Sequence, residues 1–324
     1  MQVTISVRRY NPADKETPSY WQDYALEVED TASVLDSLIK IREEDDGSLA
    51  VRCSCRSAIC GSCAMRVNGH ACLACNTKIS DVVDDSGTVK VEPVGVMPVI
   101  KDLVVNQDLF WNKIKQVSPW LQPEGPEPQA EYLAPNADMT HLAGVMSCIM
   151  CGACVSDCTV MEVDDNFIGP AALAKAYRFV ADPRDDQSGA RLAELSEYGG
   201  VWDCTRCFEC VEVCPKGVDP MGRIMSLRDG AMELGLDTTI GARHTDAFVE
   251  SVGHSGWLNE LTLPIKTFGM FNLPALMGLA PVGLRAFLRG KMPPIFHPSV
   301  PNVKNIRRLF KRVESEQKQE EQRK

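Results

Sequence analysis

The sequence has 324 residues, of which 44% are hydrophobic and 24% charged, so it is long enough for two or three folded domains and is not that of a disordered chain. Its net charge of −10 excludes a basic nucleic-acid-binding face, but residues 261–313 contain nine Lys and Arg and no acid. Fourteen cysteines would suggest disulfides in a small secreted chain, yet no leader-like segment follows Met1. We therefore expect reduced, metal-bound thiols in the cytosol.

The first fifty residues predict a two-stranded ribbon followed by a helix. Apolar and polar residues alternate over 3–7 and again over 24–28, which is typical of half-buried strands. Apolar residues within 34–39 fall on one helical face, and either Thr31 or Ser33 is suited to cap that helix.

The next segment has the cysteine spacing of a plant-type [2Fe–2S] site. Cys55, Cys60 and Cys63 form a C-x4-C-x2-C run, and this arrangement needs one more cysteine from beyond the loop. We predict Cys75 as the fourth ligand, with Cys72 as the second choice.

The surrounding residues favour the same kind of domain. Gly61-Ser62 lets backbone amides turn toward the cluster sulfurs, and Cys53 is interpreted as a small buried apolar residue. Asn68-Gly69 predicts a hairpin turn, and residues 88–92 predict a closing strand. Together these features predict a β-grasp ferredoxin domain over residues 1–105.

A connecting region follows. The apolar pattern of residues 102–117 predicts a helix, and five prolines between residues 118 and 135 predict an irregular linker. The segment 106–137 is therefore predicted to be a helix and Pro-rich linker between two domains.

Two copies of the motif C-x2-C-x2-C-x3-C dominate the rest of the chain, at residues 148–158 and 204–214. In ferredoxins with two clusters, the last cysteine of each run binds the cluster of the other run. This geometry predicts one cluster held by Cys148, Cys151, Cys154 and Cys214. It predicts a second cluster held by Cys158, Cys204, Cys210 and, as an open alternative, Cys207.

Zinc is the simpler alternative, because two CxxC pairs also suit a tetrahedral site. Four cysteines at this spacing, followed by Pro215, favour cluster binding instead. Helical patterns over residues 170–180 and 220–234 predict that this domain, residues 138–235, is mainly helical. The predicted fold class is therefore α+β, with a bacterial-type di-cluster ferredoxin domain after the β-grasp domain and a C-terminal extension.

Over residues 1–235, the sequence resembles the iron–sulfur subunit of succinate dehydrogenase and fumarate reductase. The resemblance depends on several motifs in the order found in that family. These are Cys55 to Cys75, Pro98 to Val105, Phe167 to Ala171, Tyr177 to Phe179 and Cys214 to Gly217.

The resemblance implies an electron-transfer subunit of an oxidoreductase. A flavoprotein partner with FAD would interconvert succinate and fumarate, and electrons would pass through [2Fe–2S], [4Fe–4S] and [3Fe–4S] clusters to quinone at a membrane-anchor subunit. The implied location is peripheral, on the cytoplasmic face of the membrane. The matching ligands are Cys55, Cys60, Cys63 and Cys75 for [2Fe–2S], Cys148, Cys151, Cys154 and Cys214 for [4Fe–4S], and Cys158, Cys204 and Cys210 for the third cluster.

The chain departs from this family at two places. Cys207 stands where the family usually has a different residue, so the third cluster could be [3Fe–4S] or a second [4Fe–4S]. Thr159, Val163 and Thr205 replace the Pro, Trp and His of the usual quinone pocket. These departures are compatible with a cysteine-rich membrane anchor as the partner. They also leave open a different function, that of a relay subunit for another flavin dehydrogenase or a heterodisulfide-reductase-like complex.

Residues 236–324 form an added, basic C-terminal extension. Residues 267–284 have no charged side chain, but Pro274 and Pro281 disfavour a straight membrane-spanning helix. The pattern predicts short amphipathic pieces with cations nearby, suited to anionic headgroups. Packing against the cluster domain or a partner subunit is the alternative.

Overall fold

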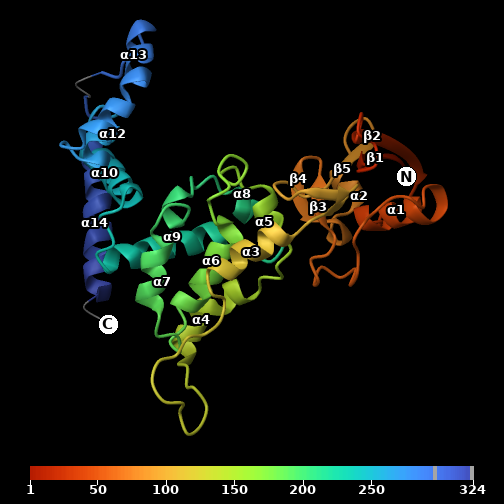
Figure 1. Cartoon of the computed structure of the whole chain (residues 1–324), viewed down its shortest axis with the longest axis horizontal. Helices are drawn as coiled ribbons and strands as arrows, with labels where there is room; N and C mark the ends of the chain where they lie inside the picture. The colour runs from red at the N-terminus through yellow and green to blue at the C-terminus, as the bar shows by residue number, and fades with distance from the viewer. Residues whose placement is uncertain (295–297, 322–324) are drawn as a thin grey trace. The chain divides into compact units, whose positions relative to one another are not determined.

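The computed structural model describes residues 1–294 and 298–321 (Figure 1). The chain divides into two compact units, Met1–Ala231 and Met232–Lys324. The first unit contains the sheet and all the cysteines, and the second contains the C-terminal extension.

The N-terminal part of the first unit is a five-stranded sheet with the strand order β2-β1-β5-β3-β4. Strands β1 and β5 are parallel, and the other neighbouring pairs are antiparallel. The strands are β1 (Gln2–Tyr10), β2 (Ser19–Glu27), β3 (Ala64–Val67), β4 (His70–Leu73) and β5 (Thr88–Glu92). The predicted ribbon, hairpin and closing strand are all present.

Helix α1 (Val34–Lys40) supplies one side of the core, and a π-helical turn, Ile41–Asp45, extends it. Ser33 is its cap: the Ser33 hydroxyl accepts from the Asp36 amide, and the Asp36 carboxylate accepts from the Ser33 amide. This reciprocal pair satisfies two of the free amides at the helix start. Buried side chains of α1, such as Leu38, pack with the inward-facing side of the sheet.

The predicted helix over residues 102–117 is wrong in its first part. Residues 99–105 form a small hairpin of β6 (Val99–Lys101) and β7 (Val104–Val105), and helix α3 begins later, at Asp108–Gln116. Asp102 turns the hairpin with a φ of 49° and accepts hydrogen bonds from Arg9 Nε at 2.9 Å and the Ala50 amide at 2.9 Å. These distant partners override the local helical pattern.

The domain after the Pro-rich linker is mainly helical, as predicted, and two further short helices lie within the sheet domain, the 3-10 helix Ala74–Asn76 and α2 (Ile79–Val82). The helices are α4 (Asn136–Met146), α5 (Ala153–Ser156), α6 (Gly169–Val180), α7 (Ser188–Leu195), a 3-10 turn at Val201–Asp203, α8 (Glu209–Glu212) and α9 (Pro220–Glu233). Most of α6 is buried, including Leu173 and Ala176. Helix α6 therefore forms the centre of the helical domain.

The Pro-rich linker is tied to this helical domain by a buried ion pair. Arg191 and Asp185 are joined at 2.9 Å, and Arg191 also donates to the carbonyls of Val117, Ser118 and Trp120. A buried guanidinium needs several acceptors, and here the linker backbone provides them.

The second unit consists of five helices in its described part. They are α10 (Ile240–Ser255), α11 (Thr262–Phe268), α12 (Leu273–Gly278), α13 (Ala280–Leu288) and α14 (Val303–Glu321). Within residues 1–294 and 298–321, no helix is both long and apolar enough to cross a bilayer.

Candidate metal centres

The loop after the first helix gathers amides around cysteine sulfurs. Cys55 Sγ accepts hydrogen bonds at 3.2 to 3.4 Å from the amides of Ser57, Ile59 and Cys60. The Ala58 amide donates to Cys75 Sγ at 3.4 Å. Amide donors of this kind stabilise the negative charge of a bound cluster.

This loop folds as it does because three residues adopt left-handed backbone conformations. Arg56, Ala58 and Gly61 have φ values of 53°, 55° and 72°. Alternation of left- and right-handed residues turns successive amides to the same side and creates an anion-binding concavity. Two of these residues have a Cβ, so their strain is maintained by the surrounding contacts.

Three further cysteines meet around the same loop. A hydrogen bond from the Ser62 side chain lowers the pKa of the Cys60 thiol to about 6, whereas burial raises the pKa of Cys63 to about 12. Cys63 interacts electrostatically with both Cys75 and Cys60. The structure thus brings together the four cysteines that the sequence pattern selected for this site.

The two remaining cysteines of this domain lie differently. Cys72 is on β4 opposite Met65, and burial raises the pKa of its thiol. Cys53 packs against the hydrophobic core but is only partly buried, whereas the sequence predicts a buried residue.

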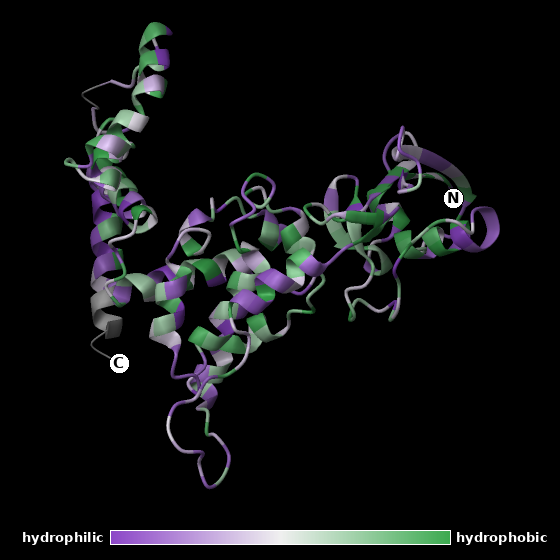
Figure 2. Cartoon of the chain, viewed as in Figure 1, coloured by the Kyte–Doolittle hydropathy of each residue, from purple (hydrophilic) through white to green (hydrophobic). Residues whose placement is uncertain are grey.

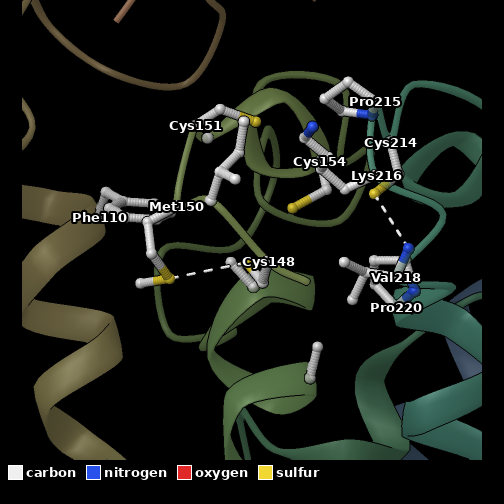
Figure 3. A pocket seen from close by; sticks show the side chains of 14 residues that line it. Phe110, Cys148, Met150, Cys151, Cys154, Cys214, Pro215, Lys216, Val218 and Pro220 are labelled. Atoms are coloured by element: carbon white, nitrogen blue, oxygen red, sulfur yellow. Dashed lines mark hydrogen bonds between the residues drawn. The ribbon is translucent and has the colours of Figure 1, made fainter. Parts of the chain in front are cut away.

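A second site lies in the helical domain. Four cysteines from two separate stretches surround one pocket, whose lining also includes Phe110 of α3 (Figure 3). The Val218 amide donates to Cys214 Sγ at 3.4 Å. The four are Cys148 after α4, Cys151 before α5, Cys154 on α5 and Cys214 after α8.

A third site is built in the same way. Its pocket is lined by four cysteines together with apolar side chains such as Phe167 and Ile224. Cys158 and Cys210 are buried, Cys204 is partly buried and Cys207 is exposed. The Thr159 hydroxyl lies 3.7 Å from Cys207 Sγ.

The two loops of the helical domain repeat one backbone conformation. Met150 and Gly152, on either side of Cys151, have φ values of 57° and 83°. Arg206 and Phe208, on either side of Cys207, have φ values of 58° and 70°. Both loops therefore have left-handed residues at matching positions, and Cys207 occupies in the second loop the position that Cys151 occupies in the first.

The chemistry of these thiols suits cationic iron. Burial is the main factor that raises the pKa of Cys151, Cys154 and Cys158, and nearby cysteines raise these values further. For Cys210, burial raises the pKa to about 12. A bound metal centre would stabilise the thiolate forms of these buried thiols.

Among the residues that the structure describes, no three His, Cys, Asp or Glu side chains converge closely enough to share a single metal ion. A cubane cluster requires a different arrangement, since each of its irons takes its own thiolate.

The three sites adjoin one another in sequence order. A Cβ atom added at Gly61, in the first site, would lie 2.8 Å from Cys151 Cβ of the second. Cys210 of the third site contributes to the electrostatic rise in the pKa of Cys154 in the second. Since α5, which carries Cys154, also packs against α8, which carries Cys210, the second site lies close to both of the others.

One carboxylate fastens the two domains beside these sites. Asp157 accepts from Arg66 Nε at 2.7 Å, from the Ala71 amide at 2.7 Å and from the Ser156 hydroxyl at 2.7 Å. The Gly95 amide donates to Ser156 Oγ at 2.9 Å. Asp157 is not among the site residues that the cysteine motifs predict, although its place directly before Cys158 is a signal that it lies at a site.

A buried cation next to the third site was also missed. Arg228 of α9 donates to the carbonyls of Val201, Trp202 and Cys204 at 2.8, 3.1 and 2.8 Å. Burial lowers the pKa of this guanidinium to about 10. Helical periodicity alone gives no sign that an arginine faces inward at this place.

A β-grasp domain with a [2Fe–2S]-type cysteine loop, joined to a helical domain with two ferredoxin motifs, defines a multi-cluster electron-transfer protein. Residues 4–112 match the family of 2Fe-2S iron-sulfur cluster binding domains, and residues 144–218 match the 4Fe-4S dicluster domain. The predicted fold class and the [2Fe–2S] and [4Fe–4S] cofactors are thereby confirmed.

The chain belongs to the iron–sulfur subunits of succinate dehydrogenase and fumarate reductase. It is 40% identical over 225 residues to the fumarate reductase iron-sulfur subunit of Mycobacterium tuberculosis (strain CDC 1551 / Oshkosh), covering 69% of this chain and 90% of the relative. It is 37% identical over 234 residues to the mitochondrial succinate dehydrogenase [ubiquinone] iron-sulfur subunit 1 of Oryza sativa subsp. japonica, covering 71% and 82%.

A solved structure agrees with this assignment. A chain of the Mycobacterium smegmatis Sdh1 complex in the apo form superposes with a TM-score of 0.66 at 26% identity, covering 73% of this chain and 98% of that chain. The two family matches end at residues 112 and 218, so the C-terminal extension lies beyond both.

Proposed function

We propose that this subunit passes single electrons between a flavoprotein partner, where succinate and fumarate are interconverted, and a quinone acceptor at a membrane-anchor subunit. The observation that supports this most directly is that neighbouring sites lie close together: Gly61 packs against Cys151, and the helices that carry Cys154 and Cys210 pack against each other. When bound, iron–sulfur clusters supply one-electron redox chemistry. The chain's own residues hold them in a row and surround them with amides.

The proposed ligands follow from the three groups of cysteines. Amide donors and mutual electrostatic interactions favour the first group, and shared pockets favour the second and third. The groups are Cys55, Cys60, Cys63 and Cys75 for [2Fe–2S], Cys148, Cys151, Cys154 and Cys214 for [4Fe–4S], and Cys158, Cys204, Cys207 and Cys210 for the third cluster.

The third cluster is proposed to be a second [4Fe–4S]. Cys207 lines the same pocket as the other three cysteines, and it raises the pKa of both Cys158 and Cys210 electrostatically. The left-handed residues on both sides of it match those beside Cys151. A thiolate at this place would retain a fourth iron, which is the difference between [4Fe–4S] and [3Fe–4S].

Electron paramagnetic resonance of the oxidised protein tests the third cluster. The wild type should give at most a weak [3Fe–4S] signal, whereas Cys207→Ser should give a strong one and lose about one iron atom per chain. Cys53→Ser is the matched control and should leave the spectrum unchanged. A full [3Fe–4S] signal in freshly prepared, oxygen-free wild type would refute the assignment.

The complex is proposed to lie on the cytoplasmic face of the cell membrane, with this subunit bound peripherally.

The proposed quinone site lies mainly in the anchor subunit. Thr159, Val163 and Thr205 replace the usual quinone-pocket residues of this subunit, so quinone would be bound by groups of the anchor, which could itself be rich in cysteine. Val163 is largely exposed, which leaves this surface open to such a partner.

The central experiment is purification of the complex without oxygen, followed by iron, sulfide and flavin analysis. Adding succinate should reduce the clusters of this subunit, and adding a quinone should reoxidise them. Clusters that are present but stay oxidised with succinate would contradict the relay between flavin and quinone. A colourless preparation without acid-labile sulfide would contradict the cluster assignment itself.

A further inference from the structure

The middle of the second unit, residues 270–292, exposes an unusual amount of apolar side chain. No residue of α12 or α13 is buried, and Phe271 and Phe287 are 90% and 69% exposed. Hydropathy colouring shows α12 and α13 as largely hydrophobic, in contrast to α14 (Figure 2). A helix that is apolar on most of its surface is normally covered by other apolar groups.

The rest of the second unit is a folded support for this segment. Arg307 of α14 donates to the His254 carbonyl of α10 at 2.6 Å, and Phe310 packs against Gly253. Helix α11 is joined to α10 by the 2.5 Å ion pair between Lys266 and Glu250. The segment with the exposed apolar surface is therefore joined to a packed group of helices, α10, α11 and α14.

The charges next to this surface are all of one sign. Arg285, Arg289 and Lys291 are exposed within and directly after α13, and further cations follow on α14. Between residues 261 and 313 there is no acid. An anionic bilayer surface matches both properties, because its acyl region accepts apolar side chains and its phosphates accept the cations.

The backbone of this segment fits a position in the plane of the interface. Pro274 and Pro281 stand in the first turns of α12 and α13, and each of these helices is far too short to cross a bilayer. Gly269 and Gly290, with left-handed φ values of 87° and 63°, interrupt the helical backbone at the two ends of this segment. Short helices that lie flat can bury one side and leave their ends near water.

We propose that residues 270–292 insert into the headgroup region of an anionic membrane, with Arg285, Arg289 and Lys291 bound to lipid phosphates. The inference deepens the proposed peripheral location by giving this subunit its own lipid contact. Lipid binding tests the membrane insertion, whereas cluster reduction by succinate tests the electron relay. Either proposal can therefore fail while the other holds.

The test is co-sedimentation of the full, cluster-loaded chain with vesicles. The chain should bind vesicles of phosphatidylcholine mixed with phosphatidylglycerol, and raised salt should weaken this binding. Replacing Arg285, Arg289 and Lys291 together by Gln should weaken it by about fivefold per cation, or on the order of 100-fold. Phe287→Glu should weaken it by roughly tenfold to 100-fold, because an apolar anchor is lost.

Matched controls separate this effect from a general change in charge. Leu133→Glu alters another strongly exposed apolar residue, in the Pro-rich linker, and Lys15→Gln removes an exposed cation from the sheet domain. Both should bind vesicles like the wild type. Unchanged visible and circular dichroism spectra would show that every variant is folded and loaded.

Two results would overturn the proposal. One is equal vesicle binding by the wild type, the triple Gln variant and Phe287→Glu. The other is no binding to protein-free vesicles but retention on membranes that contain the anchor subunit, which would assign this surface to a protein partner.

Discussion

Gly61 lies directly against Cys151, so the cysteine loop of the sheet domain touches the first cysteine loop of the helical domain. A Cβ atom at Gly61 would lie 2.8 Å from Cys151 Cβ and 3.0 Å from Cys151 Cα. Real Cβ atoms do not approach this closely, and Gly61 also has a φ of 72°. Glycine is therefore required here both for its conformation and for the close packing of two proposed cluster sites.

Gly61→Ala should destabilise the chain and slow electron transfer between the first two clusters. The left-handed conformation costs an alanine about 1 to 2 kcal/mol, and the clash adds roughly 1 to 3 kcal/mol. Gly87→Ala is the matched control, because Gly87 has a φ of 78° but no atom within 4 Å of the added carbon. Thermal unfolding should separate the two variants, and equal melting temperatures would show that the contact with Cys151 is unimportant.

Asp157→Asn should loosen the contact between the two domains. Asp157 is 9% exposed and accepts from Arg66 and from the Ala71 amide, so removing its charge should cost about 3 kcal/mol. Iron content should remain, while transfer from the [2Fe–2S] to the [4Fe–4S] cluster slows.

The control for this prediction is Glu43→Gln. Glu43 is 65% exposed and pairs with Arg42 at 3.9 Å, so its loss should change stability by less than about 1 kcal/mol. Similar unfolding curves for Asp157→Asn and Glu43→Gln would contradict a fastening role for Asp157.

Cys75→Ala and Cys72→Ala distinguish the two candidates for the fourth [2Fe–2S] ligand. Because the Ala58 amide donates to Cys75 Sγ, Cys75→Ala should abolish the [2Fe–2S] signal of the reduced protein. Cys72→Ala should retain that signal and lose only about 1 kcal/mol of packing. Spectra together with iron and sulfide analysis check this, and the reverse pattern would transfer the role to Cys72.

Much of the architecture could be predicted from local sequence. The cysteine spacings gave the domain types, the alternation over residues 3–7 gave a strand, and the prolines of the extension gave short helices, because each pattern depends on nearby residues. Ser33 was one of two possible caps, and the structure selects it because Asp36 lies three residues on.

The residues that escaped prediction depend on distant partners. Asp102 turns a hairpin because Arg9 lies beside it in space, although 93 positions separate the two residues. Asp157 depends in the same way on Arg66, 91 positions away. A local pattern contains no information on such pairs. For this reason the apolar pattern of residues 102–117 predicts a helix from its first residue, although the buried carboxylate of Asp102 organises a turn there.

Arg228 should tune the third cluster as well as stabilise its loop. Its guanidinium is buried, donates to the carbonyls of Val201, Trp202 and Cys204, and keeps a positive charge beside the proposed site. Arg228→Met should cost about 3 kcal/mol or more, because these carbonyls lose their donors. It should also lower the reduction potential of the third cluster, since a nearby positive charge favours the reduced, more negative form.

Arg206→Gln is the matched control, because it removes one positive charge at an exposed position of the loop whose carbonyls accept from Arg228. Water screens an exposed charge, so the potential should fall much less than in Arg228→Met. Redox titration followed by electron paramagnetic resonance would measure both shifts. If the two variants shift the potential equally, burial of Arg228 has no special influence on the cluster, and its role is confined to the three carbonyls.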